Sequence, residues 1–243
     1  MRNLKITIEY DGTNFVGWQR QTHGRSVQEE IETALQKLCN EPITITGAGR
    51  TDSGVHARGQ VANFKTTSSF PNEKFLYSLN SILPEDITLK NIEEVPLEFS
   101  ARYSAKERLY HYHISLAKTS IERMYCWQVH YPLNFELINI ATQILLSTQD
   151  FQSFCKVESE VEHYRCSIIK AEWEKLENSR WIFKISANRF LHGMVRAIVG
   201  TLIDVGRGYT TIEQFHFIID SRNRQNAGMA APPHGLFLME VKY

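Results

Sequence analysis

Alternating strand-like and helix-like patterns in the first hundred residues restrict this chain to a few topologies. Residues 4–10 alternate between apolar and polar or small side chains, which is typical of a half-buried strand. Ser26 then opens an amphipathic helix with the capping-box spacing Ser26-x-x-Glu29. The following patterns predict strands at 43–46 and 60–65, a helix between Pro71 and Pro84, and a strand at 87–95. The resulting order, β-α-β-β-α-β, is that of ferredoxin-like folds.

The patterns in the second half predict the same arrangement of strands and helices, although the two halves have no obvious sequence similarity. Its patterns indicate strands at 106–116, 163–176, 180–187 and 235–243, and helices at 134–147, 190–205 and 211–221. We therefore expect an α+β protein with two ferredoxin-like halves, residues 1–103 and 104–243. Their sheets are expected to join into one largely antiparallel sheet with helices on one side and an active-site cleft between the halves.

The stretch GAGRTDSGVHARGQ, residues 47–60, indicates a site rather than a simple turn. Its four glycines permit a tight loop, and Arg50, Asp52, His56 and Arg58 crowd into nine residues, which a turn does not need. The spacing lacks the third glycine of a dinucleotide fingerprint and the GK[ST] of a P-loop. The loop is therefore expected to hold a carboxylate among basic groups.

Two features of the second half could contribute chemistry. Arg196 lies in an otherwise apolar helical pattern, where an unpaired guanidinium would be costly, so we expect an acidic partner such as Asp52. Tyr110 and Tyr112 share one face of a strand, and spacing alone favours a core position over a stacking platform for a nucleobase.

Composition limits the kinds of partner and the cellular compartment that we expect for this chain. The chain has 27 Lys plus Arg against 27 Asp plus Glu, so any polyanion site must be local. Four widely separated cysteines without a CxxC pair argue against a zinc knuckle and favour buried, reduced thiols. A strand pattern at the N-terminus leaves no room for a signal peptide, and charged residues interrupt the most apolar helical stretch. We expect a cytoplasmic protein without a membrane span.

Several segments, in order from Tyr10 to Tyr243, resemble the TruA family of tRNA pseudouridine synthases. They are YDGTNFVGWQRQ, SVQEE, GRTDSGVHARGQV, LPEDI, ARYSA, DFQSF, NRFLHGMVR with IVG, and AAPPHGL with LFLMEVKY. The resemblance covers essentially the full chain, and GRTDSGVHA is its most specific segment. Two departures, Ser53 in place of a common alanine and Pro233 in place of a smaller residue, do not affect the chemistry.

The resemblance implies an isomerase that converts uridine to pseudouridine in the tRNA anticodon stem-loop, as a homodimer, without metal or cofactor. Asp52 matches the catalytic aspartate, Tyr110 the tyrosine that contacts the target uracil, and Arg196 the basic partner of the aspartate. Arg50 matches the arginine that enters the RNA as the target base leaves its stack. Four further residues match basic positions along the RNA path: Arg20, Arg25, His56 and Arg58.

Two other functions fit parts of the pattern. A noncatalytic ferredoxin-like RNA-binding protein would share the topology, but it would not need a glycine-framed Arg-Thr-Asp. A metal-dependent hydrolase could use four histidines, His56, His111, His113 and His192, but the chain has no HExxH or clustered acidic signature.

Overall fold

The computed structural model describes residues 1–157 and 161–243, which form two compact units. The first unit comprises Met1–Lys106 together with Phe237–Tyr243, and the second comprises Glu107–Leu236. Both units combine strands with helices, so the predicted α+β class is confirmed. Each unit is described separately below.

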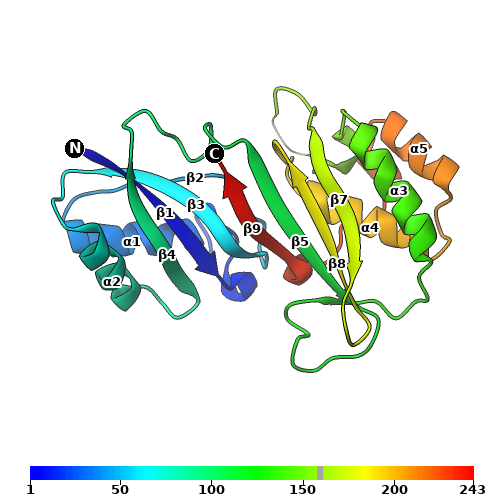
Figure 1. The fold of residues 1–243 in the computed structure, drawn as a ribbon, viewed down its shortest axis with the longest axis horizontal. Coiled ribbons are helices and arrows are strands. Elements are labelled where there is room, and N and C mark those ends of the chain that lie inside the picture. Colours follow the sequence, from blue (N-terminus) through cyan, green and yellow to red (C-terminus); the bar gives the residue numbers. More distant parts are fainter. Residues whose placement is uncertain (158–160) are drawn as a thin grey trace. The chain divides into compact units, whose positions relative to one another are not determined.

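The first unit has the predicted β-α-β-β-α-β order (Figure 1). Its strands are arranged β4-β1-β3, with β2 also paired to β3, and all three pairings are antiparallel. The strand bounds are β1 Arg2–Tyr10, β2 Thr46–Gly47, β3 His56–Thr66 and β4 Ile87–Val95. The C-terminal strand β9, Leu236–Lys242, pairs in parallel with the start of β3. This places the start of β9 beside His56, which directly follows the loop that carries Asp52.

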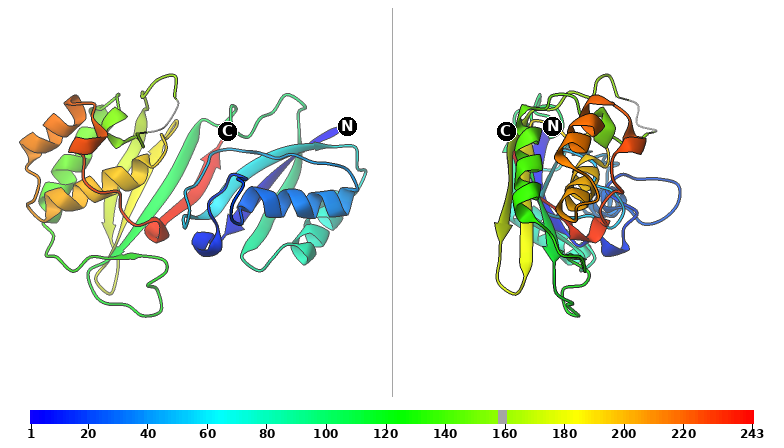
Figure 2. Two further views of the ribbon diagram at one scale, coloured as in Figure 1. Left: turned by 180° about the vertical axis from the view of Figure 1, so that it is seen from behind. Right: turned by 90° about the vertical axis from the view of Figure 1, so that its right-hand side faces the viewer.

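Two helices cover one face of this sheet, α1 (Val27–Cys39) and α2 (Asn72–Ile82), as Figures 1 and 2 show from opposite sides. The predicted cap of α1 is confirmed, because the Ser26 hydroxyl accepts the Glu29 N–H. Helix α2 begins directly after Pro71 and ends before Pro84, as the fixed backbone of proline predicts. Leu4, Ile6 and Ile8 of β1 are fully buried and form the centre of this core.

The second unit contains a sheet with the order β5-β8-β7, and the pairings are antiparallel. Its strands are β5 Glu107–Ser115, β7 Ile168–Lys175 and β8 Arg180–Ala187, and a short β6, Trp127–Gln128, lies beside β5. The hairpin between β7 and β8 turns through Asn178 and Ser179, which both have left-handed backbones with φ of 57° and 59°. Asparagine tolerates this conformation better than most residues, which explains its place at the turn.

Three helices complete the second unit: α3 Phe135–Ser147, α4 Met194–Gly206 and α5 Ile212–Asp220. Helix α4 lies across one face of the β5-β8-β7 sheet, in front of it in the left view of Figure 2. That sheet face carries Tyr112, Phe183 and Ile185, which are fully buried. The core of this unit therefore lies between α4 and the sheet.

Four predicted bounds are wrong. The strand expected at 60–65 begins at His56, because its first residues pair with β9 and with the end of β1. The other three bounds also have local reasons. The strand expected at 43–46 is only Thr46–Gly47, because the Ile45 N–H bonds to Glu32 of α1 instead of a neighbouring strand. The strand expected from 163 begins at Ile168, since Arg165 makes an isolated bridge to Asp150. The helix expected from 190 begins at Met194, after Gly193 in a left-handed conformation.

Candidate active site

Asp52 lies in an irregular loop between β2 and β3, residues 48–55, which we call the Asp52 loop. The aspartate itself is half-buried, while Thr51 before it and Val55 after it are buried. The Val55 N–H donates to the Asp52 carbonyl at 3.2 Å and closes a turn in which Gly54 has a φ of +75°. The carboxylate therefore projects from a backbone that is fixed on both sides.

A second segment, residues 11–18, holds the Asp52 loop in place, and we call it the docking segment. The Trp18 N–H donates to the Thr51 carbonyl at 3.1 Å, and Gly17 forms an isolated antiparallel bridge with Asp52. The Gly54 N–H and the Ser53 hydroxyl both donate to the Phe15 carbonyl, at 3.3 and 3.2 Å. The two segments therefore share backbone hydrogen bonds like a short pair of strands.

Glycines allow this close approach. A Cβ at Gly12 would lie 2.0 Å from the Val55 carbonyl oxygen, and a Cβ at Gly47 would lie 2.6 Å from the Trp18 indole. Neither distance is possible for a real side chain, so both positions require glycine. Trp18 is buried and packs under the loop, whereas the sequence left open whether residues 11–25 form a packed surface loop or an arm over the site. The supporting role of this segment was the main feature that sequence reasoning missed.

His56 supports the loop from inside the first unit. Its side chain is 2% exposed, and its ring stacks on Phe237 with centroids 4.6 Å apart. The Gly12 N–H donates to Nδ1 at 3.0 Å, and the same nitrogen lies 3.1 Å from an Asp11 oxygen. A ring this deeply buried does not reach a phosphate, and we therefore assign it to loop support in place of the RNA contact that the resemblance implies.

The predicted arginines of the first unit divide into two groups. Arg50 and Arg58 are exposed, and Arg58 lies over the Phe237 ring at 5.8 Å. Arg20 has a side chain 63% exposed, with long contacts of 3.6 and 3.8 Å to Glu29 and Glu32. All three can present charge to a polyanion.

Arg25 is engaged differently, because two carboxylates already bind its guanidinium. Nη1 and Nη2 donate to both oxygens of Asp86 at 2.6 and 2.9 Å, and Nε donates to Glu30 at 2.5 Å. The guanidinium also stacks on Phe15 of the docking segment, 4.3 Å from the ring centroid. Bidentate geometry of this kind raises the pKa of Arg25 and makes it a structural clamp.

Tyr110 lies on the buried face of β5, as its spacing predicts. It is 8% exposed, and Phe190 meets its ring edge-on with centroids 5.1 Å apart. Tyr112 on the same face is fully buried and donates its hydroxyl proton to the Pro232 carbonyl at 2.8 Å. Burial raises the pKa of Tyr112 well above its usual value, so this second tyrosine belongs to the core.

Arg196 is half-buried in α4 and is held by a reciprocal pair of hydrogen bonds. Its Nε donates to the Ala231 carbonyl at 2.8 Å, and the Ala231 N–H donates to the Arg196 carbonyl at 2.9 Å. Burial, with a smaller effect of Arg196, lowers the pKa of the nearby His234. The pairing of Arg196 with Asp52 stays a prediction.

The other predicted histidines show no metal-site geometry. His111 and His113 lie on the face of β5 opposite Tyr110, with ring centroids 6.3 Å apart. Within residues 1–157 and 161–243, no group of three or more His, Cys, Asp or Glu side chains is placed to hold a metal ion. In the same described residues, no helix is long and apolar enough to cross a membrane.

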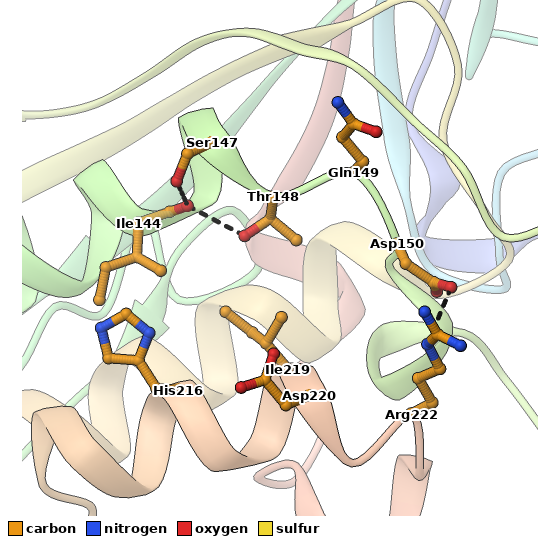
Figure 3. Close-up of a pocket in the computed structure, with 9 residues that line it drawn as sticks. All are labelled: Ile144, Ser147, Thr148, Gln149, Asp150, His216, Ile219, Asp220 and Arg222. Carbon is orange, nitrogen blue, oxygen red and sulfur yellow. Dashed lines mark hydrogen bonds and ion pairs between the residues drawn. The ribbon is translucent and has the colours of Figure 1, made fainter.

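A pocket of about 430 Å³ in the second unit contains none of the predicted site residues (Figure 3). It lies where α3 and α5 end, and an ion pair between Asp150 and Arg222, at 3.2 Å, borders it. Its lining residues are Ile144, Ser147, Thr148, Gln149, Asp150, His216, Ile219, Asp220 and Arg222. Most of these side chains are exposed or half-exposed, so the pocket is a shallow surface feature.

Known proteins resemble the whole chain. A family model described as tRNA pseudouridine synthase matches residues 6–104 and 141–243. Three similar relatives, each named tRNA pseudouridine synthase A, come from Caldicellulosiruptor bescii (42% identical), Thermoanaerobacter sp. strain X514 (44%) and Clostridium botulinum strain Alaska E43 (45%). Each alignment spans 245 residues and covers 100% of this chain and 100% of the relative.

Proposed function

This chain belongs to the tRNA pseudouridine synthase family and isomerises uridine to pseudouridine in tRNA, and we propose that the Asp52 carboxylate performs the chemistry. The observation that carries this assignment is the fixed backbone around Asp52, which hydrogen bonds from the docking segment hold on both sides. The relatives are named as synthases, so nothing in these matches favours a noncatalytic RNA-binding protein.

The reaction needs little machinery beyond a positioned carboxylate. The N1 to C1′ glycosidic bond breaks, the uracil turns, and C5 joins C1′. C5 then loses its proton and N1 gains one, so the product has the same atoms as the substrate. An ionised Asp52 can attack uracil C6, attack C1′, or remove a C2′ proton, and each route uses the same carboxylate.

The remaining roles complete the proposal. Tyr110 contacts the target uracil, and Arg196 provides the basic partner of Asp52. The target base must leave its stack, which costs about a few kcal/mol, and Arg50 enters the RNA in its place. Arg20 and Arg58 contribute exposed charge along the RNA path. We propose that the substrate region is the anticodon stem-loop and that the enzyme acts as a homodimer, which sedimentation of the free protein would test.

Substitution of the carboxylate tests the central assignment. Asp52→Asn should keep the fold and bind tRNA within about threefold of wild type, because the amide has the same shape. Turnover should fall by at least about a thousandfold, which corresponds to about 4 kcal/mol. Formation of the C5 to C1′ bond releases the C5 hydrogen, so tritium from [5-³H]uridine in the tRNA would appear in water.

The matched control is Asp220→Asn, since Asp220 is exposed and lines the shallow pocket of the second unit, which contains none of the predicted site residues. It should release tritium at the wild-type rate. If Asp52→Asn retained activity within about tenfold of wild type, a barrier change of only about 1.4 kcal/mol, Asp52 would not be the catalytic group.

A further inference from the structure

We infer that Tyr10 is a positioning residue for Asp52 and acts through the hydroxyl of Thr51. The Tyr10 hydroxyl lies 2.7 Å from Thr51 Oγ1, and the two residues are 3% and 7% exposed. This inference rests on the proposed role of Asp52 in catalysis. It assigns a function to a buried polar pair that does not itself touch the substrate.

The position of the Tyr10 ring is fixed by the sheet. Tyr10 is the last residue of β1, and its backbone pairs with Ala57 of β3 on one side and with Ile87 of β4 on the other. Its ring lies against Trp18, with centroids 6.2 Å apart. The hydroxyl is therefore a rigid point at the base of the Asp52 loop.

Thr51 transmits that rigidity to the next residue. The Thr51 carbonyl belongs to the peptide that joins Thr51 to Asp52, and it accepts the Trp18 N–H at 3.1 Å. The Thr51 hydroxyl is attached to Cβ, one bond from the backbone, so anchoring Oγ1 on Tyr10 also restrains the Thr51 backbone. Because the Thr51 carbonyl and the Thr51 hydroxyl are both held by hydrogen bonds, the plane of this peptide is fixed. The direction in which the Asp52 side chain projects from the backbone is then fixed as well.

If the Tyr10–Thr51 hydrogen bond served only the stability of the core, substitutions at the two residues should have different effects from those expected for a positioning role. Replacing both members of a buried hydrogen bond with apolar groups of the same shape is often nearly neutral for stability, whereas removing one member leaves the other without a partner. Tyr10→Phe with Thr51→Val is such a replacement. If the pair serves only the core, the double variant should recover both stability and turnover. If the pair orients Asp52, stability should recover and turnover should not.

The test measures kcat, KM for tRNA and thermal stability for Tyr10→Phe, Thr51→Val and the double variant. We expect kcat to fall about 10- to 100-fold in each, because a small misplacement of a catalytic group costs rate and not binding. KM should stay within about twofold of wild type, and the double variant should be no slower than the slower single variant.

Two further variants keep the outcome interpretable. Thr51→Ser retains the hydroxyl and should keep kcat within about threefold of wild type. Tyr243→Phe removes another phenol hydrogen bond of the first unit, to the Ala101 carbonyl at 3.0 Å, and should leave kcat unchanged. A Thr51→Ser variant as slow as Thr51→Val would contradict a role for the hydroxyl.

Asp52→Asn, assayed in parallel, separates this inference from the proposed function. If Asp52→Asn is inactive but the double variant turns over within about threefold of wild type, the positioning role of Tyr10 is refuted and the role of Asp52 stands. If Asp52→Asn is itself active, the proposed catalytic role of Asp52 fails, and the positioning role of Tyr10 fails with it.

Discussion

The Asp52 loop and helix α4 hold their charged side chains in opposite ways. In the loop, no regular element contains Asp52, and hydrogen bonds from residues 15–18 fix the backbone. In α4, the backbone is an ordinary helix, and every residue except Arg196 and Asp204 is buried. The Asp52 carboxylate projects from a backbone that hydrogen bonds to another segment hold in place, whereas Arg196 projects from a helix that apolar packing holds in place and bonds to the Ala231 carbonyl through Nε.

This difference determines which substitutions each region tolerates. The loop depends on space, because Gly12 and Gly47 beside it leave no room for a Cβ next to Val55 and Trp18. Helix α4 depends on the side chain of Arg196, whose Nε bonds to Ala231. We therefore expect side-chain atoms added at these glycines to disrupt the loop, and truncation of Arg196 to disrupt the region around α4.

The largest effect should come from removal of the charge in α4. If Arg196 pairs with Asp52 as predicted, Arg196→Met leaves an uncompensated carboxylate and should lower the free energy of unfolding by about 3 to 5 kcal/mol. Arg196→Lys keeps the charge but loses the Nε donor to Ala231, and it should cost less. Urea unfolding and tritium release would measure both. Wild-type stability and turnover in Arg196→Met would refute the pairing.

Gly12→Ala should be the next most costly change, since it adds one methyl group where the docking segment meets the Asp52 loop. A Cβ 2.0 Å from the Val55 carbonyl forces the two backbones apart, so we expect a loss of about 3 kcal/mol and of most turnover. The control is Gly49→Ala in the loop itself, where a Cβ would meet no atom within 4 Å. Equal effects at the two positions would show that the loop does not depend on close backbone approach.

The regular elements were predictable because their signals are local. The apolar period and the Ser26 cap predicted α1, and Pro71 and Pro84 limited α2. The bound of β2 could not be read from its alternating residues, since a tertiary bond from Ile45 to Glu32 removes that N–H from the sheet. Local patterns therefore give the order of elements but not every end.

The site was only partly predictable from the sequence, because its support also depends on tertiary contacts. The motif identifies Asp52, but its support comes from residues 10–18, some forty positions earlier, and no periodicity indicates that contact. A sequence position also does not reveal burial, so His56 and Arg25 read as RNA-facing cations although one is buried and the other is bound by Asp86. The glycines at 12, 17 and 47 were the available signal of close packing.

A smaller effect should distinguish Arg25, which two carboxylates bind, from the exposed Arg58. Arg25→Ala should lower stability by about 1 to 2 kcal/mol, because its partly exposed guanidinium bridges Glu30 and Asp86. It should leave the salt dependence of tRNA binding unchanged. Arg58→Ala should do the reverse, with unchanged stability and a slope of log affinity against log salt reduced by about one. Binding titrations at several salt concentrations would distinguish them, and a shallower slope for Arg25→Ala would place it on the RNA path.

The smallest expected effect is a difference in how the two units respond to pH. Burial lowers the pKa of His234 in the second unit, so the unfolded chain binds its proton first as pH falls. The contribution of His234 to the free energy of unfolding should therefore fall as pH drops below the ordinary histidine pKa of about 6.5. His234→Gln lacks this contribution, so the free energy of unfolding of the variant should rise relative to that of wild type as pH falls. In the first unit, hydrogen bonds from Thr66 and Thr67 lower the pKa of Glu41. Its contribution is complete above the unfolded pKa of about 4.3 and is lost below it.

Urea unfolding of wild type, His234→Gln and Glu41→Gln between pH 8 and pH 4 separates the two windows. The difference between wild type and His234→Gln should change between about pH 7.5 and pH 5.5, whereas the difference for Glu41→Gln should stay constant there and narrow only below about pH 5. The two windows lie at different pH because the ordinary pKa is about 6.5 for histidine and about 4.3 for glutamate. The environments determine the direction of each effect, since a histidine that loses water on burial resists gaining charge and a carboxylate that accepts hydroxyl protons resists losing it. A His234→Gln difference that is flat across the upper window would show that Arg196 and burial do not act on this histidine in the folded protein.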